Sequence, residues 1–350
     1  MNDFTHYMKR CLGLAAQGQG KVAPNPLVGC VIICDNQVIG EGFHEQYGGP
    51  HAEVNAINNV LNKEMLARST LVVSLEPCSH KGKTPPCADL IIKNKIKRVV
   101  IGAPDTNPLV AGKGIEKLRK AGIEVITDVL KDECRQLNKR FFTYHEKKRP
   151  YIILKWAQTR DGFISRKPPF KKEDNWITSP ESKKLVHQWR AQEQAIMIGT
   201  NTAILDNPEL TVRLTQGENP LRLVIDENLA IPFSHHVFSE DTRTLVFTAL
   251  AAQDRGHVQY VKTDFSKNIL PFVMQTLYER KVISVIIEGG AYLLNSFIKS
   301  GLWDEARIFT GSKEFGEGLL APPIEGRQSY TMTLAGDILH VLNNPAGDFQ

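Results

Sequence analysis

The sequence has few cysteines and no long apolar segment. Six cysteines in 350 residues are far below the density of a disulfide-stabilised scaffold. We therefore expect a reduced, cytoplasmic protein whose cysteines serve a metal site or a reaction before they serve a disulfide. No run of 18 apolar residues occurs, so the sequence predicts no transmembrane helix. Residues 1–21 lack the uninterrupted hydrophobic core of a signal peptide.

The composition is that of a globular protein, and its charge is uneven along the chain. Hydrophobic residues make up 42% and charged residues 23%, which excludes wholesale disorder. Residues 1–150 carry 22 Lys and Arg against 15 Asp and Glu, and the remainder carries 21 against 23. A mildly basic first half is suited to binding a phosphorylated small molecule, but its excess of positive charge is too small to indicate a nucleic-acid-binding surface. We expect neither nucleic acid nor membrane as a partner; self-association into a homo-oligomer is a further expectation.

Helix and strand patterns alternate along the whole chain, which is typical of an α/β fold with helices on both faces of a sheet. In the first half, the apolar spacing predicts helix 4–15, strands 27–33 and 38–43, helix 51–62, strand 71–75, helix 88–93, strand 99–101, helix 113–120, strand 125–126 and helix 129–143. In the second half it predicts strands 151–157, 195–199, 221–226, 244–248, 283–287 and 306–310, and helices 180–191, 268–280 and 290–299.

A basic cluster that ends in proline, residues 145–150, interrupts this alternation. At roughly 150 residues per domain, the length suggests two domains. We place the boundary at the cluster and predict one domain over residues 1–146 and a second over residues 150–350.

Three potential metal ligands and an acid stand out in the first half. They are His51, Glu53, Cys78 and Cys87, which form an H-x-E motif followed by P-C and a second cysteine. One imidazole and two thiolates suit Zn²⁺, and three protein ligands leave a fourth position for water. The order matches zinc nucleobase deaminases, in which the glutamate moves protons without being a ligand. Zinc lowers the pKa of its water to about 7, and Glu53 would pass the released proton to the departing amine.

The spacing of the cysteines leaves a structural alternative open. Residues 79–86 separate Cys78 from Cys87, and their glycine, prolines and basic side chains suit a loop that reaches a substrate phosphate. A fourth ligand, His80 or another cysteine, would make the site a structural zinc clip in which Glu53 has no role. The remaining cysteines fall on apolar faces or a helix and are interpreted as core or surface residues: Cys11, Cys30, Cys34 and Cys134.

Three motifs around these residues point to a known family. They are residues 24–29 (PNPLVG), 48–53 (GGPHAE) and 76–87 (EPCSHKGKTPPC). Together they resemble the bifunctional deaminase–reductase family of riboflavin biosynthesis, and the resemblance spans nearly the whole chain. It implies a cytidine-deaminase-like three-layer domain followed by a dihydrofolate-reductase-like domain. It also implies deamination of 2,5-diamino-6-ribosylamino-4(3H)-pyrimidinone 5′-phosphate and NADPH-dependent reduction of the ribosyl group to ribityl.

By resemblance, four residues contact the deaminase substrate: Asn25, His44, His80 and Lys83. An amide reads the edge of a pyrimidinone, and histidine and lysine hold a phosphate. Local explanations stay open, since Asn25 between two prolines suits a turn, His44 lies at a strand end, and Lys83 alone would be an ordinary surface lysine. The loop 105–108 either touches the substrate or only forms a turn.

The second half lacks the glycine pattern of a Rossmann domain. The nearest match to G-x-G-x-x-G is residues 316–321, and the two prolines that follow prevent a long helix there, so we interpret this segment as a loop. Gly289 and Gly290 instead follow an apolar strand and open a helix, where backbone N–H groups could approach a phosphate. Residues 198–202 are a second such place. An ordinary tight turn is the alternative for the glycine pair.

Several segments of the second half resemble the reductase domain of the family: residues 155–162, 176–179, 190–192, 206–213 and 288–290. The resemblance implies that NADPH contacts Ala157, Trp176, Thr202, Asp206 and the turn at Gly290. It implies that the reductase substrate contacts Lys155, Asp174, Arg190, Leu210, Arg213 and Glu288. Two arginines near one ligand suit a phosphate, which a planar guanidinium binds through paired hydrogen bonds.

Two departures from the family pattern bear on the second domain. Residues 166–173 are longer and more basic than the short Gly/Ser link of the family, and Glu227 stands where a small polar contact to the cofactor is usual. An acid there could repel a 2′-phosphate, so the expected preference for NADPH over NADH rests on the resemblance alone.

Two other functions stay open. One is a deaminase whose residues 151–350 are a catalytically silent oligomerisation domain; the other is a nucleic-acid-editing deaminase, against which the net negative second half weighs.

Overall fold

The computed structural model describes residues 4–79, 85–107, 110–168 and 174–346. The chain divides into two units, Met1–Lys148 and Arg149–Gln350, and the division falls inside the basic cluster. Among the described residues, no helix combines the length and the apolar character needed to cross a membrane.

Unit 1 is built on a five-stranded sheet in the order β2-β1-β3-β4-β5. β1 runs antiparallel to β2 and β3, whereas β3, β4 and β5 are parallel. The strands are β1 (Gly29–Cys34), β2 (Gln37–Phe43), β3 (Thr70–Leu75), β4 (Arg98–Ala103) and β5 (Glu124–Ile126). The helices are α1 (Thr5–Ala16), α2 (Ala52–Asn58), the 3₁₀ helix η1 (Lys63–Arg68), α3 (Cys87–Lys93), α4 (Lys113–Lys120), α5 (Lys131–Leu137) and α6 (Lys139–Lys147).

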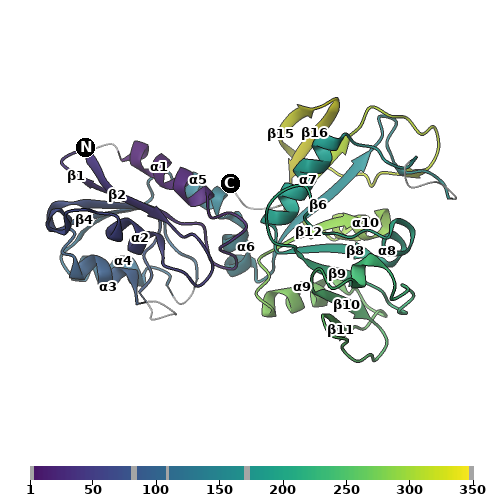
Figure 1. Ribbon diagram of the computed structural model, residues 1–350, viewed down its shortest axis with the longest axis horizontal. Helices are drawn as coiled ribbons and strands as arrows, with labels where there is room; N and C mark the ends of the chain where they lie inside the picture. Colours follow the sequence, from purple (N-terminus) through teal and green to yellow (C-terminus); the bar gives the residue numbers. More distant parts are fainter. Residues whose placement is uncertain (1–3, 80–84, 108–109, 169–173, 347–350) are drawn as a thin grey trace. The chain divides into compact units, whose positions relative to one another are not determined.

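Helices cover both faces of this sheet, as the alternating pattern predicts (Figure 1). On one face, Cys30 and Ile32 of β1 share a buried cluster with residues of α2, α3 and α4. On the other face, the Cys11 thiol of α1 donates a hydrogen bond to the Val72 carbonyl at 3.3 Å. A side chain at Gly29 would meet the carbonyl oxygen of Cys11, so glycine is needed for this close approach. Because both faces are buried, β1 is a continuous apolar run, and unit 1 has the three layers expected of it.

The predicted helix 129–143 is wrong. Two helices, α5 and α6, occupy this segment and meet at Asn138, whose φ of −100° and ψ of 20° lie outside the helical range. The Asn138 side chain is committed to a distant part of the chain. Its Oδ1 accepts a hydrogen bond from the Leu27 N–H at 2.7 Å, and its Nδ2 donates to the Leu27 carbonyl at 2.8 Å. The residue between the two helices is thus held by hydrogen bonds to Leu27, and the spacing of apolar residues gives no sign of such a contact.

Unit 2 is built on a nine-stranded sheet in the order β11-β10-β9-β8-β12-β6-β13-β16-β15. The strands from β11 to β13 are parallel, and β16 and β15 complete the sheet as antiparallel neighbours. The strands are β6 (Tyr151–Gln158), β8 (Ala195–Gly199), β9 (Leu221–Ile225), β10 (Thr244–Thr248), β11 (Val258–Lys262), β12 (Ser284–Gly289), β13 (Glu305–Thr310), β15 (Arg327–Leu334) and β16 (Asp337–Asn343), with a separate pair β7 (Phe163–Ser165) and β14 (Leu319–Leu320). The helices are α7 (Pro180–Gln192), α8 (Thr200–Asp206), the 3₁₀ helix η2 (His236–Phe238), α9 (Leu270–Glu279) and α10 (Ala291–Lys299).

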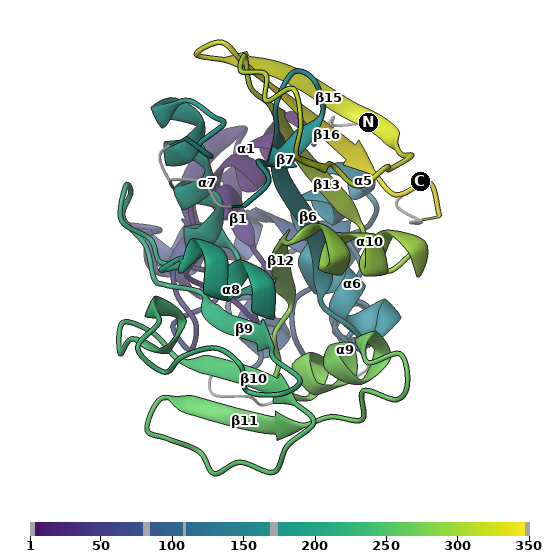
Figure 2. The same ribbon diagram turned by 90° about the vertical axis from the view of Figure 1, so that its right-hand side faces the viewer.

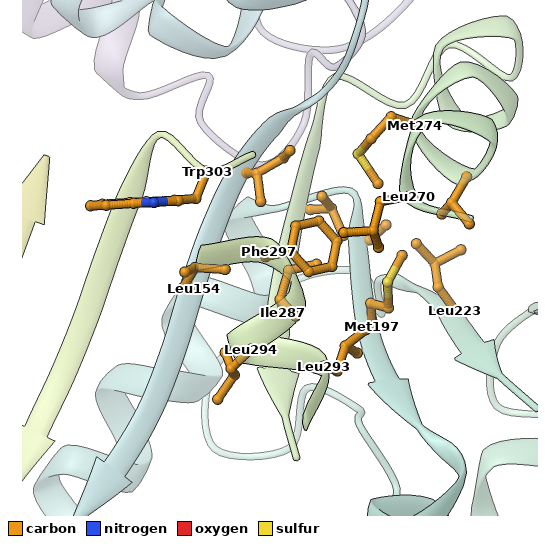
Figure 3. Packing of buried hydrophobic residues seen from close by; sticks show 14 of the residues in the cluster. Leu154, Met197, Leu223, Leu270, Met274, Ile287, Leu293, Leu294, Phe297 and Trp303 are labelled. Carbon is orange, nitrogen blue, oxygen red and sulfur yellow. The ribbon is translucent and has the colours of Figure 1, made fainter. Parts of the chain in front are cut away.

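The nine-stranded sheet is also covered on both faces, with α9 and α10 on one side and α7 and α8 on the other (Figure 2). Figure 3 shows Phe297 of α10 packed near Leu154 and Ile287 of two neighbouring strands. The next residue along β6, Ile153, points to the opposite face and shares a cluster with Trp189 of α7. Apolar side chains at alternate positions of the central strands thus fill both faces of the sheet.

A buried carboxylate organises one end of the unit 1 sheet. Glu76 directly follows β3 and is 4% exposed. Its two oxygens accept hydrogen bonds at 2.9–3.2 Å from the backbone N–H groups of Asp105, Gly112, Gly114 and Ile115. These charge-assisted bonds replace the water that a buried carboxylate loses. They hold the segment after β4 against the end of β3.

Replacing Glu76 with glutamine should destabilise unit 1. The amide keeps the size of the side chain but points an NH₂ group at backbone N–H donors, and we expect the free energy of unfolding to fall by about 3 kcal/mol. A urea melt and hydrogen exchange of residues 110–115 measure the effect, with the exposed Glu64→Gln as the matched control. Unchanged stability and exchange would contradict the role given to the carboxylate.

Candidate functional site

His51, Cys78 and Cys87 come together at the carboxyl end of β3. His51 directly precedes α2, Cys78 lies just beyond β3, and Cys87 is the first residue of α3. His51 Nδ1 lies 3.6 Å from Cys78 Sγ and 3.3 Å from Cys87 Sγ. The donor atoms of the three residues all lie within 4.8 Å of one another. One imidazole nitrogen and two sulfurs at this spacing fit tetrahedral Zn²⁺ with one position for another ligand.

The surroundings of Cys78 favour its thiolate form. Hydrogen bonding to the Cys87 thiol and to the His51 ring lowers the pKa of Cys78 to about 4, and the Cys87 backbone N–H also donates to Cys78 Sγ at 3.3 Å. The thiolate is the form of cysteine that binds zinc. No fourth donor joins the trio in the described part of the chain. His80, the alternative fourth ligand, lies outside the described residues.

Glu53 is a buried acid beside the trio. It lies in the first turn of α2 and is 3% exposed. Burial raises its pKa to about 7, and the charge of Cys78 adds to the rise. A carboxyl group that titrates near neutrality both accepts and releases protons at physiological pH.

Two of the predicted deaminase contacts, Asn25 and His44, lie next to the trio. The His44 ring meets the His51 ring edge-on, with centroids 5.4 Å apart. His44 Nδ1 lies 2.9 Å from the Pro50 carbonyl oxygen, which only accepts, so Nδ1 carries the proton and Nε2 accepts from Asn25 Nδ2 at 3.1 Å. Burial lowers the pKa of His44, in agreement with a neutral ring. The other two predicted contacts, His80 and Lys83, lie outside the described residues.

The loop that begins at Asp105 contains the turn that was weighed for it. Asp105 Oδ1 accepts a hydrogen bond from the Asn107 N–H at 2.7 Å, which is the bond of an Asx turn. Burial raises the pKa of Asp105 to about 7. The Thr106 hydroxyl is buried and has no hydrogen-bond partner among the described residues. Turn chemistry is therefore present, and contact between this loop and a substrate stays a prediction.

Unit 2 contains a cavity of about 1190 Å³, which exceeds the usual volume of a site for one small ligand. Most of the residues predicted for the cofactor and the reductase substrate line it: Lys155, Ala157, Trp176, Arg190, Thr202, Asp206, Leu210, Arg213, Glu288 and Gly290. Asp174 is not among the lining residues, whereas its neighbour Asn175 is.

Parallel strands bring these residues to one edge of the sheet. Leu154 of β6 is in register with Ile287 of β12, so the residues that follow them, Lys155 and Glu288, are neighbours. The Gly289–Gly290 pair comes next and opens α10, as predicted. The two glycines are joined by a cis peptide bond. Ligands of open α/β sheets bind outside the carboxyl ends of the strands.

Glu288, Arg190 and Lys155 form a charged group in the cavity wall. Arg190 Nη2 donates to Glu288 Oε2 at 2.8 Å, and Lys155 Nζ lies 3.9 Å from Glu288 Oε1. Burial opposes the charge of Glu288, but the Arg190 and Lys155 cations outweigh it and lower the pKa of Glu288. Burial lowers the pKa of Lys155. Glu288 Oε1 and Arg190 Nε are buried without a hydrogen-bond partner in the described part of the chain, so an acceptor and a donor remain for a ligand.

Two residues that the sequence analysis missed, His187 and Lys183, lie with Arg190 and Arg213 beside this group. His187 lines the cavity, and burial together with the charges of Arg190, Arg213 and Lys183 lowers its pKa to about 4. Its Nδ1 accepts a hydrogen bond from the Arg213 backbone N–H at 3.1 Å. Gathered positive charge of this kind suits a phosphate. The sequence did contain a sign of this cluster. Lys183, His187 and Arg190 are four and three residues apart, a spacing that places them on the same face of one helix.

Comparisons with known proteins match both units. Residues 1–103 match the cytidine and deoxycytidylate deaminase zinc-binding region, and residues 150–337 match the RibD C-terminal domain. The riboflavin biosynthesis protein RibD of Aquifex aeolicus is 44% identical over 323 residues, which cover 90% of this chain and 88% of that protein.

Solved structures agree over nearly the whole chain. The diaminohydroxyphosphoribosylaminopyrimidine deaminase/5-amino-6-(5-phosphoribosylamino)uracil reductase of Thermotoga maritima is 39% identical, with a TM-score of 0.88 and coverage of 97% of this chain and 98% of that one. RibD of Acinetobacter baumannii is 32% identical, with a TM-score of 0.87 and the same coverage of 97% and 98%. The predicted fold class, a cytidine-deaminase-like domain followed by a dihydrofolate-reductase-like domain, is confirmed. The chain belongs to the RibD family of bifunctional riboflavin-biosynthesis enzymes, in which a zinc-binding deaminase domain is joined to a reductase domain.

Proposed function

We propose that unit 1 deaminates 2,5-diamino-6-ribosylamino-4(3H)-pyrimidinone 5′-phosphate and that unit 2 reduces the ribosyl group of the product to ribityl with NADPH. The final product is 5-amino-6-ribitylamino-uracil 5′-phosphate. The proposal rests on the observation that one chain contains two separate sites, one in each unit. The His51, Cys78 and Cys87 trio lies beside buried Glu53 in unit 1, and a cavity with the Glu288 carboxylate in its wall lies in unit 2.

Glu53 is the proposed proton carrier of the deamination. When bound by the trio, zinc supplies an activated water near neutral pH. The Glu53 carboxylate holds the proton released as the new C–O bond forms, and returns it to the amine as the C–N bond breaks and ammonia leaves. Its pKa of about 7 suits both transfers.

Asn25 and His44 are the proposed contacts to the pyrimidinone ring. Because Asn25 Nδ2 donates to His44, the amide oxygen of Asn25 is the atom offered to a ring N–H. We propose His80 and Lys83 as the phosphate contacts on the strength of the family resemblance.

In unit 2, the proposed reaction takes place at the group formed by Glu288, Arg190 and Lys155. When bound, NADPH supplies a hydride, and the substrate is the ring-opened sugar in its imine form. C1′ gains the hydride, and the imine nitrogen gains a proton from an acid at this edge or from a water that the acid holds. Arg190 and Arg213 are proposed to bind the phosphate, and Lys155 to orient the ribose.

A catalytically silent second unit accounts less well for the cavity. A domain that served only for oligomerisation would have no need of buried polar atoms without partners, such as Glu288 Oε1 and Arg190 Nε. We further propose that the enzyme works in the cytoplasm as a homo-oligomer. All six cysteines are free, which supports a reducing compartment.

Unit 1 should bind one zinc ion per chain. We expect X-ray absorption to show two sulfurs, one imidazole nitrogen and one oxygen around the metal. Chelation should abolish deamination and leave the reduction of pre-deaminated substrate unchanged, because the second reaction uses a different unit. A shell with two nitrogens and no oxygen, as His80 would give, would identify a structural clip and contradict the deaminase proposal.

Replacing Glu53 with glutamine should separate metal binding from turnover. The amide keeps the shape of the side chain but cannot carry the proton, so deamination should fall about 10²-fold or more while zinc stays bound. Steady-state assays of both half-reactions and metal analysis check this, with Glu64→Gln as control. Loss of both activities in the Glu53 variant would overturn the assignment of this residue to unit 1 alone.

Asp206→Asn and Glu288→Gln should each depress reduction strongly, about 10²-fold, and leave deamination intact. Both residues line the cavity, and each substitution removes a charge with little change in size. Assays of the two half-reactions measure the effect. The alternative role of Asp206 is to begin the turn after α8. The left-handed backbone conformation of that turn, however, belongs to Asn207, whose φ is 39°. A full reductase rate with a lowered melting temperature in Asp206→Asn would favour the turn.

A further inference from the structure

The acid at the end of β9 lines the same cavity as the proposed reductase site. β8, α8 and β9 form a β-α-β unit in which Gly199 is in register with Ile225. Glu227 lies two residues beyond Ile225, and Gly199 and Glu227 both line the cavity. In β-α-β sites for dinucleotides, an acid at the end of the second strand bonds the hydroxyls of the adenosine ribose.

Of the two adjacent acids at this position, Glu227 is the one available to a ligand. Asp226 is 1% exposed. Its carboxylate accepts hydrogen bonds from the Ala230 and Ile231 N–H groups at 3.0 and 3.1 Å and from the Thr200 hydroxyl at 3.2 Å, which commits it to the turn after β9. Glu227 is exposed, and its carboxylate takes part in none of the ion pairs formed among the described residues.

The place of Glu227 along the sheet edge suits the adenosine end of a dinucleotide. The strands β9, β8, β12 and β6 are neighbours in this order, so three strand spacings, about 14 Å, separate the end of β9 from Lys155 on β6. Gly199 and the Gly289–Gly290 turn lie between them. A dinucleotide with its nicotinamide at Lys155 would cross the glycines with its pyrophosphate and place its ribose at Glu227.

Lys267 offers little compensating charge for Glu227. Lys267 also lines the cavity, but its side chain is 80% exposed and its Nζ lies 3.3 Å from the Asp264 carboxylate. An exposed lysine that already faces an acid contributes little to holding a phosphate.

We propose that Glu227 sets the dinucleotide preference of unit 2. Its carboxylate accepts hydrogen bonds from the 2′- and 3′-hydroxyls of the adenosine ribose and repels a 2′-phosphate, so that NADH binds at least as tightly as NADPH. This inference rests on the proposed reductase function and revises the cofactor preference taken from the family resemblance.

Equilibrium binding of NAD⁺ and NADP⁺ to the full chain, measured by titration calorimetry at fixed ionic strength, tests the inference. For the unsubstituted chain we expect a Kd for NADP⁺ equal to or larger than that for NAD⁺. Glu227→Ser, and Glu227→Gln with nearly unchanged size, should lower the ratio of the two constants about tenfold or more, mainly by tightening NADP⁺, because like charges no longer meet. The exposed Glu240→Ser, which lies outside the cavity lining, should leave the ratio unchanged.

The outcomes separate this inference from the function on which it rests. Tighter binding of NADP⁺ than NAD⁺ by the unsubstituted chain, or a ratio that neither Glu227 variant changes, would overturn the role of Glu227 and leave the reductase proposal standing. Failure of both dinucleotides to bind the unsubstituted chain would overturn the reductase proposal itself, and this inference with it.

Discussion

Burial of both faces of each sheet is the constraint on which the two sites depend. In the parallel strands the backbone polar groups are used by neighbouring strands and most side chains are apolar, so the residues of both sites gather toward the carboxyl ends of the strands. In unit 1, Cys78 follows β3 and Asp105 follows β4. In unit 2, Lys155 and Glu288 lie toward the ends of β6 and β12, and Glu227 lies beyond β9. Both units thus concentrate their chemistry on one edge, although their strand orders differ.

Buried acids at these edges differ in function because their partners differ. Glu76 is surrounded by backbone N–H donors and serves as a fixed anchor for a loop. Glu288 is held as a carboxylate by Arg190 and Lys155. At Glu53, burial outweighs the opposing charge of His51 and raises the pKa to about 7, which makes it the acid suited to proton transfer. The same chemical group therefore anchors a loop, takes part in a charged site, or is proposed to carry a proton, according to what surrounds it.

Local features were predictable from the sequence, whereas features that depend on distant partners were not. The metal trio could be predicted because its ligands lie in short motifs, and most strands because burial on both faces makes them continuous apolar runs. β15 was missed because it is almost entirely exposed and has no continuous apolar run, although Tyr330, Met332 and Leu334 alternate with threonines. The anchoring role of Glu76 and the contact of His187 with Arg213 join residues 26 to 39 positions apart, which spacing along one element does not reveal.

The hydrogen bonds between Asn138 and Leu27 determine how far a deaminase fragment can be shortened. The match to the zinc-binding region ends at residue 103, and a fragment ending there would retain His51, Cys78 and Cys87. It would lose Asn138, whose side chain holds both polar groups of the Leu27 backbone, two residues from Asn25. It would also lose the buried α5 and α6 side chains beneath the sheet. Such a truncation would keep the metal ligands but release the segment that carries the proposed ring contact. The fragment would therefore still bind the ion after it had lost its affinity for the substrate.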